Sequence, residues 1–420
     1  MNMNRSAVLR ALAFAFSLGL IIFATGAVAA ANTLTVGNAT SGTCPHVFPS
    51  IQSAVSVASS GDTIQVCPGT YLESIGVDKG LIIKGDNAGI SPNGGTRVTE
   101  SILNGGGSTT IRISTTEPVT IDGFTFSGGS GAMIDSYTSG HNPTIIRNIF
   151  TAQVNGLFFY QPALFTFEDN YLHDLVDCGG CEGLFIAGNW NGTTGTVASI
   201  KANVWKNLLD APATNLSNIS GTISGNQFSY VAYYCVFLAN GTNVDVCGNT
   251  FDHTINPNPN PLAGGSATWG AGVRFYEPSA GFGARITGNT FTSNYVGIGV
   301  RPANDITGMD VYAHNNNFVG NTSAGLRHLG LGTFNATNNW WNSASGPTNA
   351  GNFGGTGDVV DGTGPVNFTP WLTAASTVGC FSVVTNKNQC KDGGWMTYRR
   401  ANGTAFKNQG DCVSYTVNGK

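Results

Sequence analysis

Charged side chains are scarce in this sequence. Aspartate, glutamate, lysine and arginine make up 10% of the 420 residues, and the formal net charge at pH 7 is −4. Binding to a nucleic-acid backbone is typical of domains with a clear excess of basic residues, and this chain has none. We therefore expect no nucleic-acid partner.

Helical periodicity is also missing from most of the chain. Within the repeats described below, no stretch keeps apolar residues at i, i+3 and i+4 for ten residues. Apolar and other residues instead alternate over short segments, as they do from Ile298 to Arg301. Alternation with a period of two predicts strands with one buried face, and the 58 glycines suit many tight turns between them. The chain is predicted to be all-β.

A long apolar run occurs near the start, from Ala11 to Phe23. Arg5 and Arg10 precede it, and the small residues Ala29 to Ala31 follow it. This pattern predicts a secretory signal peptide over residues 1–31, with an uncleaved membrane anchor as the alternative. We expect a secreted, extracellular protein that makes no membrane contact after cleavage. Without the two arginines, 17 basic and 23 acidic residues remain, a net charge near −6.

A short phrase recurs along the chain: an asparagine, one variable residue and then a large apolar residue. The steps between these anchor asparagines are 22, 33, 23, 23, 40, 27 and 23 residues, so the longer steps are a base period with insertions. A fixed period in this range indicates one structural unit stacked many times. The anchors are Asn148, Asn170, Asn203, Asn226, Asn249, Asn289, Asn316 and Asn339.

The anchor asparagines also suggest how the units stack. Asparagine tolerates the left-handed backbone conformation of tight turns. Stacked at one corner of successive coils, its side-chain amide can bond the amide of the next coil and form a ladder. The alternative is that each asparagine merely marks a polar turn, which does not explain its fixed place before the large apolar residue.

Two segments near the start of the mature chain are the most specific: Pro49 to Val55 (PSIQSAV) and Gly61 to Tyr71 (GDTIQVCPGTY). With the repeats, they make residues 49–372 resemble the right-handed parallel β-helix proteins of the pectate-lyase-like superfamily. Many members of that superfamily are secreted and act on polysaccharides. The resemblance implies a single-stranded solenoid over residues 63–372. It also implies a capping segment, residues 32–62, with a helix that covers the open end of the first coil.

Residues 380–420 differ from the coils. Their motifs, Cys390 to Trp395 and Phe406 to Val413, look like a short Cys-bounded module that ends many secreted bacterial proteins. The resemblance implies a bacterial source and carries no known chemistry. A module of this size needs its disulfide to stay folded.

Nine cysteines in an exported chain favour disulfides over metal sites. Cys44 and Cys67 flank the cap, and Cys390 and Cys412 bracket the tail module, so each is expected to form a pair. Cys235 and Cys247 are plausible partners of each other. Cys178 and Cys181 could close on themselves, which leaves Cys380 over, but the sequence does not decide the connectivity.

The strand that follows each anchor has an outward face. Aligned on the glycine before the strand, Leu157 and Phe159 and their equivalents face the core. Aromatic side chains on the outward face could stack on sugar rings, and arginine forks bind carboxylates at two points, which suits an acidic polysaccharide. The alternative is an ordinary solvated sheet. The predicted polysaccharide-binding residues are Phe158, Tyr160, Phe185, Arg274, Tyr276, Arg301 and Arg327.

An acidic run from Glu168 to Asp177 is a second candidate site. Asp174 and Asp177 could hold calcium, which β-helix lyases use to bind uronates. Two His–Asp pairs, His173–Asp174 and Asp252–His253, occupy the same corner but lie about 14 Å apart at ~4.8 Å per coil, too far to act on one bond.

These observations favour binding over catalysis. The aligned outward positions contain no aspartate, which disfavours hydrolysis. They also contain no arginine or lysine next to the possible calcium ligands, which disfavours lyase chemistry. We expect a monomeric protein that binds an extracellular or cell-wall polysaccharide. A polysaccharide lyase or glycoside hydrolase and a structural or adhesive surface protein are the alternatives.

Overall fold

The computed structural model describes residues 31–418, except 43, 153–154, 176–181, 189–194, 259, 261–263, 381, 392 and 401–404. The expected signal peptide lies outside the described residues apart from Ala31. None of the helices in the described ranges combines the length and the apolar character needed to cross a membrane.

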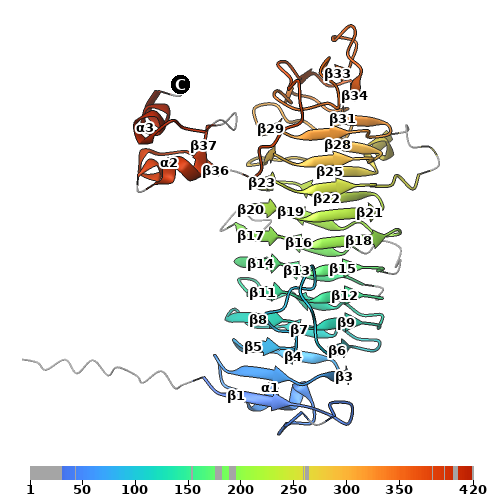
Figure 1. Cartoon of the computed structure of the whole chain (residues 1–420). Coiled ribbons are helices and arrows are strands. Elements are labelled where there is room, and N and C mark those ends of the chain that lie inside the picture. Colours follow the sequence, from blue (N-terminus) through green and yellow to red (C-terminus); the bar gives the residue numbers. More distant parts are fainter. Residues whose placement is uncertain are drawn as a thin grey trace, which may run out of the picture. The chain divides into compact units, whose positions relative to one another are not determined.

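Three long sheets carry the fold, and Figure 1 shows their strands stacked coil above coil. Sheet A contains, in spatial order, β1 (Thr33–Val36), β2 (Thr63–Val66), β5 (Ile82–Lys84), β8 (Pro118–Asp122), β11 (Asn142–Ile146), β14 (Leu164–Glu168), β17 (Thr196–Lys201), β20 (Ile219–Ser224), β23 (Asn243–Cys247), β26 (Gly283–Thr287), β29 (Asp310–His314), β32 (Phe334–Asn335) and β35 (Val366–Asn367).

Sheet B contains β3 (Gly69–Leu72), β6 (Ser101–Asn104), β9 (Thr125–Ser127), β12 (Ile149–Thr151), β15 (Tyr171–His173), β18 (Val204–Leu208), β21 (Gln227–Val231), β24 (Thr250–Asp252), β27 (Thr290–Thr292) and β30 (Asn317–Val319). Sheet C contains β4 (Ile75–Val77), β7 (Ile111–Ile113), β10 (Ile134–Ser136), β13 (Leu157–Tyr160), β16 (Leu184–Ala187), β19 (Thr214–Ser217), β22 (Tyr234–Ala239), β25 (Ala271–Tyr276), β28 (Val296–Val300), β31 (Ala324–His328), β34 (Gly357–Asp361) and β33 (Pro347–Thr348).

Neighbouring strands in all three sheets are parallel, and from β2 to β32 each coil contributes one strand to sheets A, B and C in turn. This is a parallel β-helix, so the predicted all-β solenoid is confirmed. The core residues lie on the inner faces of the three sheets and form one continuous cluster along the stack.

The asparagine ladder is confirmed. The anchor asparagines lie at the corner between sheets A and B, and the side-chain amide of each donates to the side-chain oxygen of the next at 2.9 to 3.2 Å. One detail of the prediction is wrong. The left-handed residue is the one before each anchor, such as Arg147 (φ 54°) or Gly225 (φ 63°). The asparagine itself is free to point its amide inward along the stack.

The large apolar residue two positions after each anchor stacks on its counterpart in the next coil. Ring centroids lie 4.4 to 5.1 Å apart from Trp205 to Trp341, within the range for offset aromatic stacking. The stacked residues are Trp205, Phe228, Phe251, Phe291, Phe318 and Trp341.

The capping helix is also present. Helix α1 (Ile51–Val57) buries Ile51 and Val55 against strands β1, β2 and β4, the first strands of sheets A and C. Ser50 caps its N-terminus through a bond from the Ser53 backbone amide, and the Glu73 carboxylate accepts from the backbone amide of Ile51 at 2.9 Å. The helix therefore closes the first coil as the sequence indicated.

Two connecting segments run along the ladder corner, and each bonds to coils that are distant from it in the sequence. The loop of residues 86–100, between β5 and β6, reaches later coils: Asn93 donates to the backbone oxygens of Asn170 and Ala202 at 3.2 and 3.4 Å. Residues 370–380, here called the strap, run back from the last coils. In the strap, the Ser376 backbone amide donates to Asn317 at 2.7 Å.

The disulfides confirm two expected pairs and correct the third. Cys44 bonds Cys67, and Cys390 bonds Cys412. Cys247 bonds Cys380 at the end of the strap, so the Cys235–Cys247 pairing is wrong. Cys235 lies on sheet C in the core, with its sulfur 3.2 Å from the Thr254 hydroxyl, whereas Cys247 ends a strand of sheet A at the ladder corner. The cysteines at 178 and 181 lie outside the described residues.

The tail forms a small core of its own around the Cys390–Cys412 bond, with Val384 and Phe406 buried. Its elements are β36 (Ser382–Val383), the 3-10 helix η2 (Lys387–Cys390), α2 (Gly394–Thr397), β37 (Tyr398–Arg399) and α3 (Gln409–Asn418).

Candidate functional site

The strand register of sheet C places one residue from each coil in a row on its outer face. We call this the outer row. A second row beside it holds Tyr160, Ala187, Ser217, Ala239 and Tyr276. The outer row runs Gly76, Arg112, Asp135, Phe158, Phe185, Asn215, Phe237, Arg274, Gly299, Arg327 and Asp361.

The predicted residues therefore do share one face, but the arginine end of it is covered. Arg274 is 5% exposed and Arg327 is 6% exposed, so the expectation that these two face solvent is wrong. The cover is formed by residues 264–270 of the insertion between β24 and β25, the insertion that accounts for the 40-residue step between two anchors. Its 3-10 helix η1 (Gly264–Thr268) lies against β28.

Glycine at position 299 makes this cover possible. A Cβ atom on Gly299 would lie 2.9 Å from the Cβ of Thr268, too close for two side chains. With only a hydrogen there, Thr268 can approach the sheet, and its hydroxyl accepts from Arg274 Nε at 3.1 Å.

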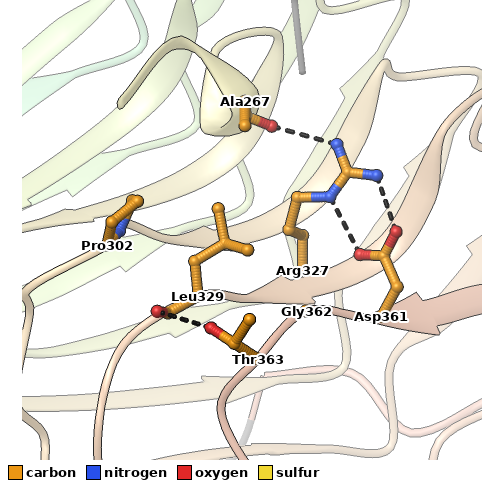
Figure 2. A pocket seen from close by; sticks show the side chains of 7 residues that line it. All are labelled: Ala267, Pro302, Arg327, Leu329, Asp361, Gly362 and Thr363. Atoms are coloured by element: carbon orange, nitrogen blue, oxygen red, sulfur yellow. Dashed lines mark hydrogen bonds and ion pairs between the residues drawn. The ribbon is translucent and has the colours of Figure 1, made fainter. Parts of the chain in front are cut away.

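Arg327 is committed to the protein, as Figure 2 shows. Its Nε and Nη2 donate to the two carboxylate oxygens of Asp361 at 2.9 and 2.7 Å, and its Nη1 donates to the Ala267 carbonyl at 3.1 Å. Bonding to Asp361 raises the pKa of Arg327. Because Nε and Nη2 of Arg327 are both bonded to Asp361, Arg327 cannot bind the carboxylate of a ligand with the same two groups. Pro302 and Leu329 line the adjoining cavity of about 410 Å³.

The other two arginines lie against rings. Arg274 sits 5.6 Å from the Tyr234 ring centre and 5.5 Å from that of Phe237, and burial lowers its pKa to about 10. Arg301 lies 4.2 Å from the ring centre of Tyr276 and 3.9 Å from the Glu277 carboxylate. These contacts fix the guanidinium groups within the sheet surface.

The opposite end of the face is open and aromatic. Tyr137 is 62% exposed and stacks on Tyr160, with ring centres 4.8 Å apart and planes 17° apart. Phe185 lies 5.3 Å from Tyr160 and 6.1 Å from Phe158. We call these four residues the aromatic platform. The sequence alignment missed Tyr137, which follows β10, because Met133 and not a glycine precedes the first residue of that strand.

A second omission concerns aspartate. Asp135 and Asp361 both occupy the outer row, on strands β10 and β34 that the sequence alignment did not include. The aligned positions contain no aspartate, but the whole row does. Asp135 is 2% exposed and accepts from Arg112 Nε at 2.9 Å and Nη2 at 2.7 Å, as Asp361 does from Arg327. Both carboxylates are thus neutralised by a bidentate arginine.

One further carboxylate on this face was not singled out from the sequence. Glu182, which precedes β16, accepts from Asn215 Nδ2 at 2.7 Å. Burial raises the pKa of Glu182. Burial is also the main cause of the raised pKa of Tyr160 and of Tyr234, and the charge of Glu182 adds to both shifts. The signal that could have found it is its place three residues before Phe185, on the same coil.

The proposed calcium ligands are only partly described. Asp174 bonds the ring of His173 at 2.7 Å, which lowers the pKa of Asp174, while Asp177 lies outside the described residues. No cluster of three or more His, Cys, Asp or Glu side chains suited to a metal occurs among the residues with described positions. A calcium site there stays a prediction.

The two His–Asp pairs lie on sheet B, at the ends of β15 and β24, and are not brought together. Between them, a groove of about 430 Å³ crosses β15, β18, β21 and β24 and includes Tyr171, Lys206 and Asp252.

Comparison with protein-family models, curated protein sequences and solved structures finds no match for the chain.

Proposed function

We propose that this protein binds an extracellular or cell-wall polysaccharide on the outer face of sheet C. The observation that carries the proposal is the aromatic platform: four rings from three successive coils, stacked side by side and open to solvent at Tyr137. Flat apolar ring faces match the apolar faces of pyranose rings, and an extended row on a straight sheet matches an extended chain.

The covalent structure supports an extracellular setting. Three disulfides join the described coils and tail, and such bonds persist in oxidising compartments. Together with the predicted signal peptide, they favour a protein that is exported, in keeping with the bacterial secreted proteins that its tail resembles.

Affinity electrophoresis through gels that contain single polysaccharides tests the proposal. The mature chain is compared with Tyr137→Ala and Tyr160→Ala, and with Phe353→Ala as the control, because Phe353 is a fully exposed ring outside sheet C. We expect retardation of the wild type and of the control. Each platform variant should weaken binding about tenfold, the size of one lost stacking contact.

The same incubations are examined by mass spectrometry for new chain ends, with calcium and with chelator. Unsaturated uronate ends or new reducing ends would replace simple binding by lyase or hydrolase activity. Retardation that survives both platform substitutions would place the binding surface elsewhere and contradict the proposal.

A further inference from the structure

Charge is divided unevenly between the coils and the tail. Residues 32–379 contain 11 basic and 21 acidic side chains, a net charge of −10, whereas residues 380–420 contain 6 basic and 2 acidic ones, a net charge of +4. One short end of the chain thus carries the sign opposite to the rest. Such an asymmetry indicates a segment that interacts with a charged partner.

The acidic side chain that the structure describes in the tail is used within the tail itself. Asp411 accepts from Arg400 Nη2 at 2.6 Å and from the Lys407 backbone amide at 2.8 Å. Arg400 also lies 4.6 Å from the ring centre of Phe406. In the described part of the tail this is the only ion pair, so Arg400 and Asp411 cancel each other and belong to the packing of the module.

Three lysines carry charge on the surface of the tail. Lys387, Lys391 and Lys407 are exposed, and no carboxylate that the structure describes in the tail forms an ion pair with them. Asp392 lies outside the described residues, and the net charge of +4 already counts it as fully ionised. The tail therefore presents positive charge that its own acidic residues do not balance.

The fold of the tail keeps these charges close together. The Cys390–Cys412 disulfide joins η2, which begins at Lys387, to α3, with the two Cα atoms 5.7 Å apart. A compact unit of about 40 residues has a radius of gyration of about 9 Å, close to the Debye length of about 8 Å at physiological salt. A charged partner therefore meets the lysines as one group.

We infer that the tail is an electrostatic binding module for a linear extracellular polyanion, a polymer with closely spaced phosphate or carboxylate groups. The inference does not depend on the proposed function of sheet C. Neutralising several anionic groups of such a polymer releases bound counterions, and this gain falls as salt rises. Lysine binds phosphate and carboxylate as a point charge, so the charge density of the polymer sets the affinity. The coils, with their net charge of −10, repel the same polymer.

The test uses the full mature chain with inorganic polyphosphate and polygalacturonate as probes, which separate phosphate from carboxylate. Dissociation constants are measured by affinity electrophoresis at pH 7, from about 50 to about 300 mM sodium chloride. The tail variant combines Lys387→Gln, Lys391→Gln and Lys407→Gln. Thermal melting and a non-reduced peptide map verify that the variant folds and keeps the Cys390–Cys412 bond.

The control variant combines Lys84→Gln, Lys201→Gln and Lys206→Gln in the coils, so the whole chain loses the same charge in both variants. We expect the wild type to bind both polymers, and polyphosphate more tightly because its charges are closer together. At the lowest salt the tail variant should bind about a hundredfold more weakly, since each lysine contributes about a tenfold effect or slightly less. Its plot of log affinity against log salt should be shallower by about 2, and the control should change affinity less than about threefold.

Four results would overturn the inference. The first is no binding of either polymer by the wild type at the lowest salt. The second is an equal loss in the tail and control variants, which would show that overall charge alone matters. The third is loss of polyphosphate binding in Tyr160→Ala, which would place the site on sheet C. The fourth is tighter binding to an oligothymidine than to polyphosphate, which would indicate a nucleic-acid partner.

Discussion

Cys247 and Cys380 are 133 positions apart in the sequence and are joined by a disulfide. The bond fastens the strap to the ladder corner at Asn249, three anchors before the last one. The loop of residues 86–100 also bonds this corner, at Asn170 and Ala202. The disulfide and the loop therefore both link distant coils along the same edge of the β-helix. Contacts between neighbouring coils are local, so long-range fasteners of this kind couple coils that would otherwise separate independently.

Removing the Cys247–Cys380 bond should destabilise the last coils. We expect Cys380→Ser to lower the free energy of unfolding by about 2–4 kcal/mol, because the cross-link then no longer restricts the conformations of the unfolded chain. Thr377→Ser, an exposed change on the same strap, is the control. Thermal melting gives the stability, and a non-reduced peptide map gives the pairing. A peptide in which Cys235 is linked to Cys247 would refute the assignment.

The middle of the asparagine ladder is expected to be sensitive to truncation. Asn226 accepts from the backbone and side-chain nitrogens of Asn203 and donates to the oxygens of Asn249 and Ile200, each at 2.9 to 3.0 Å. Asn226→Ala leaves several buried groups without partners and should cost about 3 kcal/mol. The exposed Asn367→Ala serves for comparison in urea unfolding. Equal midpoints for the two variants would mean that the ladder contributes no net stability.

Arg327 is expected to act in stability and not in binding. Arg327→Lys keeps the positive charge but loses the two-point contact with Asp361, and should lower the free energy of unfolding by about 2 kcal/mol. Polysaccharide affinity should not change. Arg112→Lys, whose side chain is 56% exposed, should lower stability by less than about 1 kcal/mol. A loss of affinity in Arg327→Lys at unchanged stability would restore the arginine to the binding surface.

Glu182 should make the free energy of unfolding of the protein depend on pH. Burial raises the pKa of Glu182 above its ordinary value of 4.5, so the folded state holds this proton more tightly than the unfolded state. Stability contributed by the group is therefore full below about pH 4.5 and is lost as pH rises through the higher folded pKa. Glu182→Gln keeps the acceptor for Asn215 and removes the charge.

The check is a series of melting curves from pH 4 to pH 8. We expect Glu182→Gln to melt at a higher temperature than the wild type at pH 8, and the difference to shrink towards pH 4. A difference that grows as the pH falls would have the wrong sign and would show that the carboxylate is stabilised in the folded protein.

Much of the architecture followed from the sequence because its causes are local or periodic. The spacing of the anchors determines which residues meet in successive coils, so the sequence alone placed Asn203, Asn226 and Asn249 in one ladder. Alternation along a strand decides which side chains face inward, so Leu157 and Phe159 were placed in the core. The capping helix and the disulfide of Cys44 also join segments that are close in sequence.

What covers a face is not periodic, and only the tertiary structure decided it. Alternation correctly put Arg274 and Arg327 on the outer side of sheet C, but an insertion folds back over them and buries both. The partner of Cys247 and the contacts of Asn93 depend on segments that return from distant coils. The tertiary structure also decides which charges on this face are paired. Asp361 pairs with Arg327, while Glu182 is bonded to the amide of Asn215. The repeat sets where side chains point, and long-range packing determines which of them solvent or a ligand can reach.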